Sequence, residues 1–356
     1  MISNTVSIDI QKVGNSRVNE IDFENLPFGR EFSDHMFVMD YADGKWGTPK
    51  IIPFGNIQIH PATSALHYGQ SIFEGMKAYR NKENEAFLFR PDMNIKRMNI
   101  SCQRMCMPEI PEEIFMEALK TLVSIDKQWI PDTEGGSLYI RPFMFATDEY
   151  VGIKPSDNYR FMIFTCPVGG YYSTPVKVKL ERHYTRAARG GVGQAKTAGN
   201  YAASLYPAKL AQQQGYHQLL WTDGLSHEYI EESGTMNVCF MINGKLITPS
   251  EDSDTILKGI TKRSVIEIAK SWGVEVEERP VKVAEVIDAI ENGSLTEMFG
   301  AGTAATIAHI EILGVEGRDY VLPAIEGREF SNKVNDYLTN LKKGKIEDPF
   351  NWNIKL

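Results

Sequence analysis

The sequence has few cysteines, no long apolar run and no excess of positive charge. Its four cysteines are too few and too irregularly spaced for a disulfide framework, and Cys102 and Cys106 lack the nearby partners of a metal site. No stretch approaches the roughly 18 apolar residues of a membrane span, and the N-terminus shows neither a signal peptide nor an arginine-rich transit pattern. We therefore expect reduced thiols in a cytoplasmic protein that has no metal and does not contact a membrane.

Lysine and arginine together total 38 residues, against 46 aspartates and glutamates, which gives a formal net charge of −8. Such a chain lacks the overall positive field that attracts nucleic acid phosphates, so nucleic acid is not an expected partner. Hydrophobic residues make up 42% and charged residues 24% of the 356 positions, as in ordinary globular proteins. At roughly 150 residues a domain, this length predicts two compact domains.

The pattern of elements changes about halfway along the chain. Short extended segments broken by turn residues fill the first third, with helices predicted at 92–106 and from Pro111 to just before Pro131. Glycine and proline then concentrate in Pro167–Pro175, which is typical of a linker. The predicted organisation is an N-terminal domain at 1–168, a linker at 169–180 and a C-terminal domain at 181–356.

In the second half, strands alternate with helices whose apolar residues recur three or four positions apart. The helices are predicted at 202–214, 261–272 and 283–292. A small basic cluster near the C-terminus contains Lys342, Lys343 and Lys345. Such a cluster is typical of a solvated surface, and we assign it no function.

The most unusual segment is Arg186–Tyr201, where glycines, two arginines and a lysine crowd together. The run from Gly190 to Thr197 differs from a phosphate-binding P-loop only at its second glycine, but the polar residues before it are not those of the buried strand that a P-loop follows. Alternatively, Lys196 is a nucleophile whose amine forms a Schiff base with an aldehyde. A surface lysine in a glycine-rich loop is the third interpretation, and this segment alone does not decide among them.

Three other segments point to a bound anion and a heteroaromatic ring. Gly259-Ile260-Thr261 and Gly302-Thr303 are glycine–threonine turns, and we expect Thr261 at the N-cap of a helix. Free backbone N–H groups at such turns bind phosphate. Glu232 is suited to hold a proton on the nitrogen of a pyridine-based cofactor. Each segment also has an ordinary structural explanation, as a capped helix, a tight turn or an exposed acid.

These segments belong to a set of motifs that occur in order along the chain: Tyr68–Arg80, Arg90–Met98, Tyr139–Pro142, Lys196–Tyr201, Glu232–Asn237, Gly259–Thr261 and Gly302–Ala304. Together they resemble the branched-chain amino acid aminotransferases, class IV enzymes of fold type IV that use pyridoxal 5'-phosphate (PLP). The resemblance runs from about Phe28 to about Glu311. It implies an α/β protein with a smaller N-terminal α/β domain, a larger β-rich C-terminal domain with helices, and the cofactor at the domain interface.

The resemblance also implies which residues bind the cofactor. Lys196 would be the catalytic residue, which forms the Schiff base with PLP and carries the proton between substrate and cofactor. Tyr201 would hydrogen-bond the phenolic oxygen, and Glu232 would keep the pyridine nitrogen protonated. The remaining cofactor-binding residues, most of which would hold the phosphate, are Arg97, Gly259, Ile260, Thr261 and Thr303.

The implied reaction is reversible, ping-pong amino transfer between leucine, isoleucine or valine and 2-oxoglutarate. The walls of the apolar substrate pocket would be formed by Phe73, Tyr79, Tyr139 and Tyr171. Backbone N–H groups of Thr303 and Ala304 would take the α-carboxylate, and Arg141 would accept the side-chain carboxylate of glutamate. Tyr68 would reach the site of the neighbouring subunit, which implies a homodimer.

Two other enzyme groups of the same fold share part of these motifs, namely D-amino acid aminotransferases and aminodeoxychorismate lyases. The choice of branched-chain substrates rests mainly on Tyr139, Arg141 and the block that begins at Phe73. The chain departs from mammalian members at Ala305–Ala308, where those proteins carry a Cys-x-x-Cys redox switch. We therefore expect no thiol switch.

Overall fold

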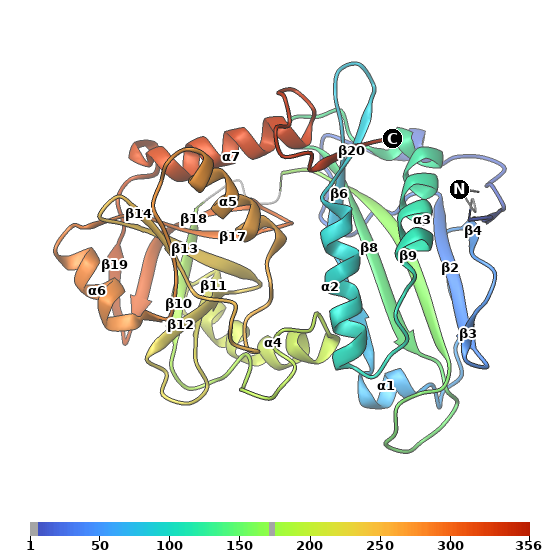
Figure 1. Ribbon diagram of the computed structural model, residues 1–356, viewed down its shortest axis with the longest axis horizontal. Coiled ribbons are helices and arrows are strands. Elements are labelled where there is room, and N and C mark those ends of the chain that lie inside the picture. The colour runs from blue at the N-terminus through green and yellow to red at the C-terminus, as the bar shows by residue number, and fades with distance from the viewer. Residues whose placement is uncertain (1–5, 171–174) are drawn as a thin grey trace. The chain divides into compact units, whose positions relative to one another are not determined.

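The computed structural model describes residues 6–170 and 175–356 (Figure 1). The chain folds into two compact units, each with its own sheet and its own apolar core. The first unit comprises Met1–Tyr171, Ala195–Ala198 and Asn340–Leu356, and the second comprises Tyr172–Gln194 and Gly199–Thr339. Among the helices of the described residues, none is both long and apolar enough to cross a bilayer.

The two units differ from the predicted domains in two places. Ala195–Ala198 and Asn340–Leu356, which the sequence patterns assign to the C-terminal domain, belong to the first unit. The C-terminal segment does so because its strand β20 (Asn353–Lys355) pairs with β7 (Ala86–Phe89). With these segments the first unit is the larger one, which corrects the expected order of sizes. Pairing between residues so far apart in sequence leaves no local pattern that could predict it.

The first unit is built on a mostly antiparallel sheet in the order β1-β4-β2-β9-β8-β6-β7-β20, with β3 paired to β2 and β5 paired to β8. Its other strands are β1 (Asp9–Ile10), β2 (His35–Ala42), β3 (Lys45–Trp46), β4 (Lys50–Pro53), β5 (Ser71–Phe73), β6 (Met76–Arg80), β8 (Ser137–Ala146) and β9 (Tyr159–Val168). The long strands β8 and β9 lie in the middle of this order.

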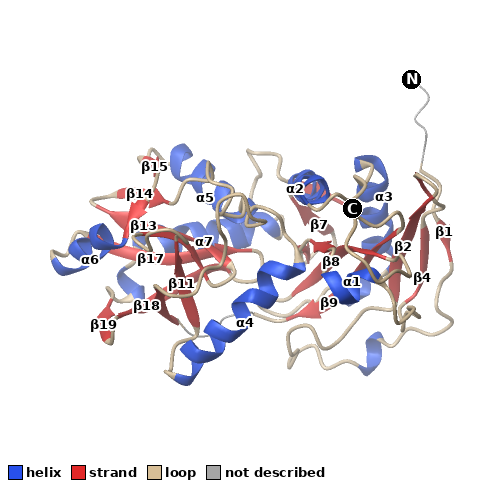
Figure 2. Ribbon diagram, turned by 90° about the horizontal axis from the view of Figure 1, so that it is seen from below, coloured by secondary structure: helices blue, strands red, loops and turns tan. Residues whose placement is uncertain are grey.

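Helices α2 (Pro91–Arg104) and α3 (Glu112–Ile125) lie on the same face of this sheet (Figures 1 and 2). Both confirm predicted helices, and each begins at a proline as expected. Because side chains alternate along a strand, Leu138 and Ile140 of β8 pack in the core with these helices. Tyr139 belongs to a separate cluster on the opposite face of β8. That opposite face therefore carries residues predicted to bind substrate.

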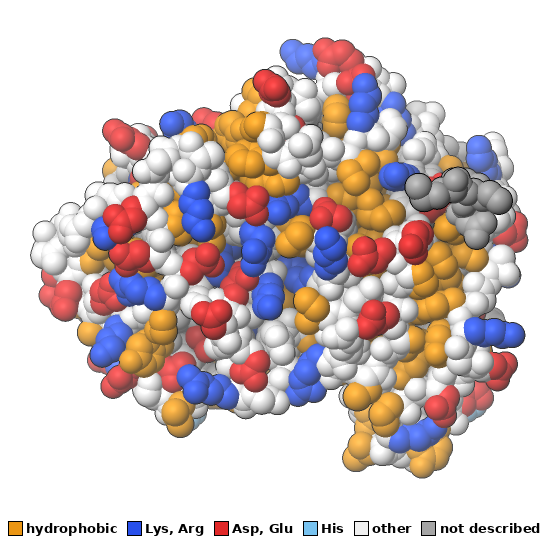
Figure 3. All heavy atoms as spheres, in the orientation of Figure 1, with side chains coloured by type: hydrophobic (Ala, Val, Ile, Leu, Met, Phe, Trp, Pro, Cys, Tyr) orange, Lys and Arg blue, Asp and Glu red, His pale blue; other side chains and the backbone are white. Residues whose placement is uncertain are grey.

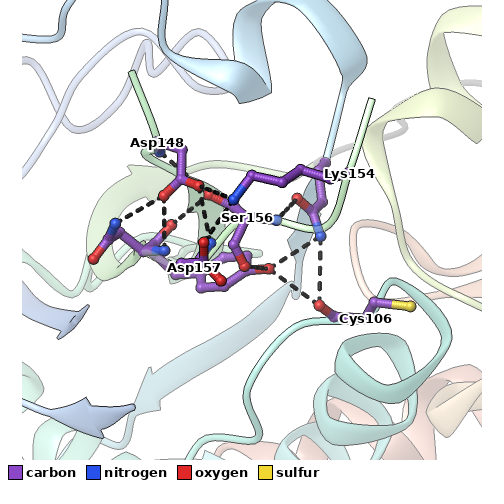
Figure 4. Close-up of polar contacts among 8 residues, drawn as sticks. Cys106, Asp148, Lys154, Ser156 and Asp157 are labelled. Carbon is purple, nitrogen blue, oxygen red and sulfur yellow. Dashed lines mark hydrogen bonds and ion pairs between the residues drawn. The ribbon is translucent and has the colours of Figure 1, made fainter. Parts of the chain in front are cut away.

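The loop between β8 and β9 is held by the carboxylate of Asp148 (Figure 4). This carboxylate accepts hydrogen bonds from the backbone N–H groups of Asp157 at 3.0 Å and Asn158 at 2.9 Å, and it pairs with Lys154 at 3.4 Å. Partial burial disfavours the charged form, but the hydrogen bonds outweigh it and lower the pKa of Asp148 to about 2. The ordered loop presents an apolar tip to solvent, in which Ile153 is 94% exposed.

The second unit is built on a sheet in which six strands close into a ring. The order is β15-β14-β13-β17-β18-β10-β11-β12-β16, and β12 also pairs with β13. This closure leaves the ring without the unpaired edges that an open sheet exposes. The strands are β10 (Val176–Glu181), β11 (Gln218–Thr222), β12 (Tyr229–Ser233), β13 (Met236–Ile242), β14 (Lys245–Thr248), β15 (Val276–Glu278), β16 (Val281–Lys282), β17 (Leu295–Gly302), β18 (Thr306–Val315) and β19 (Arg318–Val321), which pairs with β18.

Four longer helices follow the linker: α4 (Ala198–Gln213), α5 (Ile260–Ser271), α6 (Val283–Glu291) and α7 (Glu329–Lys342). The first three confirm predicted helices, whereas α7 is not predicted. Single-turn 3₁₀ helices occur at Val18–Glu20, Lys127–Trp129 and Ile325–Gly327.

The end of α7 corrects the expected solvated basic cluster. Lys342 is only 3% exposed, and its Nζ lies 5.0 Å from the ring centroid of Phe89 and 5.9 Å from that of Tyr79. Burial lowers the pKa of Lys342 to about 7. The prediction that this cluster is solvated is therefore wrong for Lys342. The local sequence does not reveal that Lys342 is the last residue of α7 and is buried.

All four cysteines are unpaired thiols, as predicted, and three of them are buried. Burial raises the pKa of Cys102 to about 12 and the pKa values of Cys166 and Cys239 to about 11. Such thiols are poor nucleophiles because so little thiolate forms. On the surface shown in Figure 3, positive and negative side chains are interspersed over both units.

A buried guanidinium organises the C-terminal part of the second unit. Arg328 is 2% exposed and donates hydrogen bonds to the backbone carbonyls of Pro323, Met298 and Ile310, the last two at 3.0 and 2.7 Å. Glu297 of the same β17 strand accepts the backbone N–H of Phe330 at 2.8 Å. Together these bonds attach the segment before α7 to β17 and β18.

Replacing Arg328 by leucine would leave these carbonyls buried without donors. We expect Arg328→Leu to reduce the free energy of unfolding by about 3 kcal/mol or more, measured as the shift of the urea transition by circular dichroism. The matched control is Arg318→Leu, because the Arg318 side chain is 65% exposed, pairs with Glu291 and lies over the ring of Tyr320 at the surface. The control should barely move the transition. Equal losses in the two variants would contradict the assigned role of Arg328.

Candidate active site

The backbone on both sides of Lys196 is fixed to the first unit. The Lys196 N–H donates to Ser101 Oγ of α2 at 2.9 Å, and the Lys196 carbonyl accepts from the N–H of Phe73 at 3.0 Å. Thr197 forms a bridge with Ile72 of β5 and donates its hydroxyl to the carbonyl of Ser71 at 2.7 Å. The backbone of Lys196, the predicted nucleophile, is therefore held by hydrogen bonds on both sides. The glycine-rich sequence around it does not predict this.

The side chain of Lys196 is half-buried against an aromatic ring. Its Nζ lies 4.8 Å from the ring centroid of Phe73, within the range of a cation–π contact. The positive charge of Lys196 is also felt by Glu74, the next residue after Phe73. These contacts set Lys196 apart from an ordinary surface lysine, which corrects the third interpretation of the segment.

Glu74 and Arg97 form a buried ion pair beside Lys196. Arg97 of α2 contacts Glu74 through Nε at 2.7 Å and through a terminal nitrogen at 2.8 Å, and Asn94 donates to the same carboxylate at 2.7 Å. Burial disfavours the charged carboxylate, but Arg97 and the hydrogen bonds outweigh it and lower the pKa of Glu74. Glu74 thus holds Arg97 in place. The sequence patterns assigned no role to Glu74, although it lies within the Tyr68–Arg80 motif.

Arg141 lies among aromatic rings on the face of β8 that is opposite α2 and α3. It donates to the hydroxyl of Tyr139 at 3.0 Å, and its guanidinium carbon lies 4.6 Å from the ring centroid of Phe73. Its Nε is buried and has no hydrogen-bond partner in the part of the chain that the structure describes. Gly75 is required opposite, because a Cβ there would lie 2.2 Å from the Tyr139 hydroxyl. A buried donor without a partner, set in apolar walls, is suited to bind the carboxylate of a ligand.

Lys77 is a further cation on this face that the sequence did not point to. It stands opposite Tyr139 on the neighbouring strand β6, and Cys166 stands opposite Tyr139 on β9. Lys77 is buried, and burial lowers its pKa to about 8. The only signal in the sequence was its place in the motif that begins at Tyr68.

The remaining predicted substrate residues of the first unit fall in different surroundings. Tyr79 of β6 is buried, and burial raises the pKa of its hydroxyl well above the ordinary value. Tyr68 ends the short helix α1 (Ser64–Tyr68) and is 41% exposed. Tyr171 lies outside the described residues.

In the second unit, Glu232 is a buried carboxylate with two partners. One oxygen accepts the backbone N–H of Leu257 at 2.7 Å, and the other lies 3.1 Å from Nε of Arg186. Glu232 thus points inward, as the cofactor interpretation requires, and is not an exposed acid. Arg186 was noticed only as part of the glycine-rich segment, and its pairing with Glu232 was not predicted.

Glycine at position 259 allows a close contact at the start of α5. Gly259 is the N-cap residue, and a Cβ there would lie 1.7 Å from Oδ1 of Asn237, whose amide donates to the carbonyl of Leu257 at 3.0 Å. Asn237 pairs with Glu232 across β12 and β13. Thr261 is therefore the second residue of the helix and not its N-cap, which corrects the expectation. The first N–H groups of this helix lack intrahelical acceptors and can bind an anion.

Thr303 and Ala304 lie in the tight turn between β17 and β18, as the sequence predicts. Gly302 keeps this turn close to Met236, since a Cβ there would approach its Cγ to 2.8 Å. Tyr201 lies in the first turn of α4 and is half-buried.

The P-loop interpretation of Gly190–Thr197 is wrong. The preceding strand β10 ends at Glu181, and turns occupy the residues between it and Gly190. The N–H of Gly190 donates to the side chain of Asp254 at 2.6 Å, and the N–H of Gln194 donates to the Asp254 carbonyl at 2.9 Å. Protein oxygens therefore accept backbone N–H groups that a P-loop would direct at phosphate.

Comparisons with known proteins agree with this arrangement. Residues 71–311 match the amino-transferase class IV family. The chain is 46% identical over 340 residues to branched-chain-amino-acid transaminase 1 of Bacillus subtilis (strain 168), covering 94% of this chain and 95% of that protein. Among solved structures, it is similar to the branched-chain aminotransferase of Thermoproteus uzoniensis with norvaline, with a TM-score of 0.74 and 23% identity over 90% of this chain and 99% of that one.

A second similar structure is the branched-chain amino acid aminotransferase of Thermobaculum terrenum in its PLP form, with a TM-score of 0.72 and 23% identity over 92% of this chain and 99% of that one. The chain therefore belongs to the class IV aminotransferases, and within that class to the branched-chain-amino-acid aminotransferases. The predicted resemblance and the fold type are confirmed.

The crowding at Gly259 generates a prediction. Gly259→Ala would force Asn237 aside and loosen the start of α5, so we expect lower thermal stability and faster hydrogen exchange at the backbone amides of Leu257–Thr261, at a cost of about 1–3 kcal/mol. Gly327→Ala is the matched control, because nothing lies within 4 Å of its Cβ position. Unchanged exchange at 257–261 in the first variant would contradict the close contact with Asn237.

Proposed function

We propose that this enzyme transfers the amino group reversibly between leucine, isoleucine or valine and 2-oxoglutarate, with PLP as its cofactor. The observation that carries the proposal is the buried Arg141 Nε without a hydrogen-bond partner among aromatic side chains. Apolar walls suit a branched aliphatic side chain, while the guanidinium suits the second carboxylate of glutamate or 2-oxoglutarate. One pocket can thus serve both half-reactions.

The described residues fit PLP in type and environment. Lys196 offers an amine on a rigid backbone, Glu232 offers a buried carboxylate, and the start of α5 offers backbone N–H groups for a phosphate. When bound, PLP supplies an electron sink for the electron pair left at the substrate Cα once its proton is removed.

The protein groups then have distinct tasks. Lys196 attaches the cofactor and afterwards moves the proton at the substrate Cα. Glu232, oriented by Leu257 N–H and Arg186, holds a proton on the pyridine nitrogen. Tyr201 donates to the phenolic oxygen. The phosphate is held by Arg97, Ile260, Thr261 and Thr303, and Gly259 permits the close approach of the backbone.

Substrate binding uses backbone and side-chain groups together. The N–H groups of Thr303 and Ala304, in the turn after β17, take the α-carboxylate. Arg141 takes the side-chain carboxylate of the glutamate half-reaction. The apolar part of the substrate packs against Phe73, Tyr79, Tyr139 and Tyr171.

The proposal includes a cytoplasmic homodimer. Tyr68 is 41% exposed at the end of α1, and the loop between β8 and β9 presents the apolar residues Val151 and Ile153 to solvent. Apolar side chains on an ordered loop favour contact with another protein surface. A second copy of this chain is the occupant that the family resemblance supports, with Tyr68 directed at the partner's site.

The proposed role of Lys196 predicts the loss of turnover in Lys196→Ala. With proton transfer removed, the rate with leucine and 2-oxoglutarate should fall by roughly a thousandfold or more, while the unfolding transition is retained. Lys209→Ala in the exposed part of α4 is the control and should keep full activity. In the unchanged enzyme, the visible absorption band of bound PLP should disappear with leucine and return with 2-oxoglutarate. Full activity of Lys196→Ala would refute the mechanism, and a band that leucine leaves unchanged would point to a D-amino acid or aminodeoxychorismate.

The proposed role of Arg141 predicts a selective defect. Arg141→Met should reduce kcat/KM for glutamate by roughly a hundredfold, because a charged hydrogen bond is lost, while leucine is affected far less. The two half-reactions can be measured separately in single turnovers. Equal losses for glutamate and leucine would count against carboxylate recognition by Arg141.

A further inference from the structure

A cavity of about 920 Å³ lies in the second unit, beside strand β12. It is enclosed by β12, by the turn from Asp223 to Ser226 and by the loop from Pro249 to Ile256. None of the residues proposed to bind cofactor or substrate lines it. The reaction proposed above therefore leaves this cavity without a role.

One of the residues that line the cavity, Glu231, holds a buried carboxylate. Glu231, which lines the cavity, is 7% exposed, and its Oε1 accepts a hydrogen bond from the hydroxyl of Thr255 at 2.5 Å. Its Oε2 is buried and has no hydrogen-bond partner among the described residues. Side chains alternate along a strand, so Glu231 and Glu232 point to opposite faces of β12. A buried acceptor left unsatisfied costs stability, and such a group calls for a ligand.

Burial raises the pKa of Glu231, while the positive charge of Arg186 favours its ionised form, and three aspartates add negative charge around the cavity. Asp223, Asp252 and Asp254 also line the cavity, whereas Arg189, at its exposed rim, is the basic residue among the described lining residues. Partial burial disfavours the charged form of Asp223, but four backbone N–H groups, among them that of Ser226 at 2.7 Å, lower its pKa to about 2. The cavity thus keeps its negative charge at neutral pH and attracts cations.

The walls combine this charge with apolar surface. Ile256 is a buried side chain that lines the cavity, and Pro249 and Pro280 complete an apolar wall. Within residues 6–170 and 175–356, no three His, Cys, Asp or Glu side chains are grouped so that they could hold one metal ion together. A metal ion would also make no contact with the apolar wall. An organic cation can contact both the carboxylates and the apolar wall.

We propose that this cavity binds a small organic ammonium ion, whose N–H donates to Oε2 of Glu231 and whose compact apolar body packs against Ile256, Pro249 and Pro280. The ammonium group can belong to a simple amine or to an amino acid, since Arg189 at the rim is positioned to meet a carboxylate. The site is distinct from the proposed substrate pocket, and its occupancy does not depend on turnover.

The first experiment measures binding to the PLP-loaded enzyme by calorimetry. The probe is N,N-dimethylisobutylamine, which carries one N–H when protonated and, as a tertiary amine, cannot condense with an aldehyde. Its neutral isostere N,N-dimethylisobutyramide is the ligand control and should bind at least about tenfold more weakly, since it lacks the charged donor. Equal binding of the two compounds, or no binding of the amine at millimolar concentration, would overturn the proposal.

Two protein variants locate the bound amine. Glu231→Gln should weaken amine binding by about tenfold or more, with an unfolding measurement to show that the variant is folded. Leu225 is 89% exposed at the rim, so Leu225→Lys is a second variant that should not disturb the fold. Its added positive charge should weaken binding severalfold at low salt, whereas Leu225→Gln should not. Unchanged affinity in both Glu231→Gln and Leu225→Lys would place the amine elsewhere and refute the site.

A further titration separates the two sources of the ammonium group. N,N-dimethylleucine is a tertiary amine that also carries a carboxylate. Only the part of its binding that is lost in Glu231→Gln is attributed to the cavity. Tighter binding than the amine, lost in Arg189→Gln, would support the proposal with an amino acid as the ligand. Equal or weaker binding would support it with a simple amine as the ligand.

Discussion

A carboxylate that is withdrawn from water stays charged only when cations and hydrogen-bond donors replace its hydration shell. Glu74 meets this condition through Arg97 and Asn94, both of α2, and its own N–H donates to the carbonyl of Pro142 in β8. The ion pair therefore fastens α2 to the strands that carry Phe73 and Arg141. Because α2 also supplies Ser101, which binds the N–H of Lys196, the position of the Lys196 backbone depends on this buried pair.

In the second unit, a backbone N–H and the guanidinium of Arg186 stabilise the buried carboxylate of Glu232. Glu232 and Asn237 are paired across β12 and β13, and both bind the backbone of Leu257, one through its N–H and the other through its carbonyl. The loop that leads into α5 is thus anchored to the ring of strands just before the helix begins.

Residue types and their order along the chain singled out Lys196, Glu232 and the two glycine–threonine segments, whose roles in binding and catalysis stay predictions. They also predicted the central strands and most helices, because periodicity and proline at helix starts are local signals. They did not predict that Arg186 pairs with Glu232, that Glu74 holds Arg97, or that Lys342 is buried. Each of these depends on contacts between residues far apart in sequence, for which a single chain offers no pattern. The placement of Thr261 inside α5 and not at its start is a smaller error, since Gly259 is also an acceptable N-cap residue.

The pairing of β20 with β7 has a consequence for biosynthesis. Trp352, just before β20, packs edge-on against Phe89, and its backbone carbonyl accepts a hydrogen bond from the N–H of Arg90. During synthesis on the ribosome, β7 emerges long before β20, so one side of β7 stays unpaired until Asn353–Lys355 has been made. The whole of the second unit emerges in the meantime. The sheet of the unit that begins first is therefore completed only after the second unit has been made, and a chain that stops before Asn353 would lack one strand of this sheet.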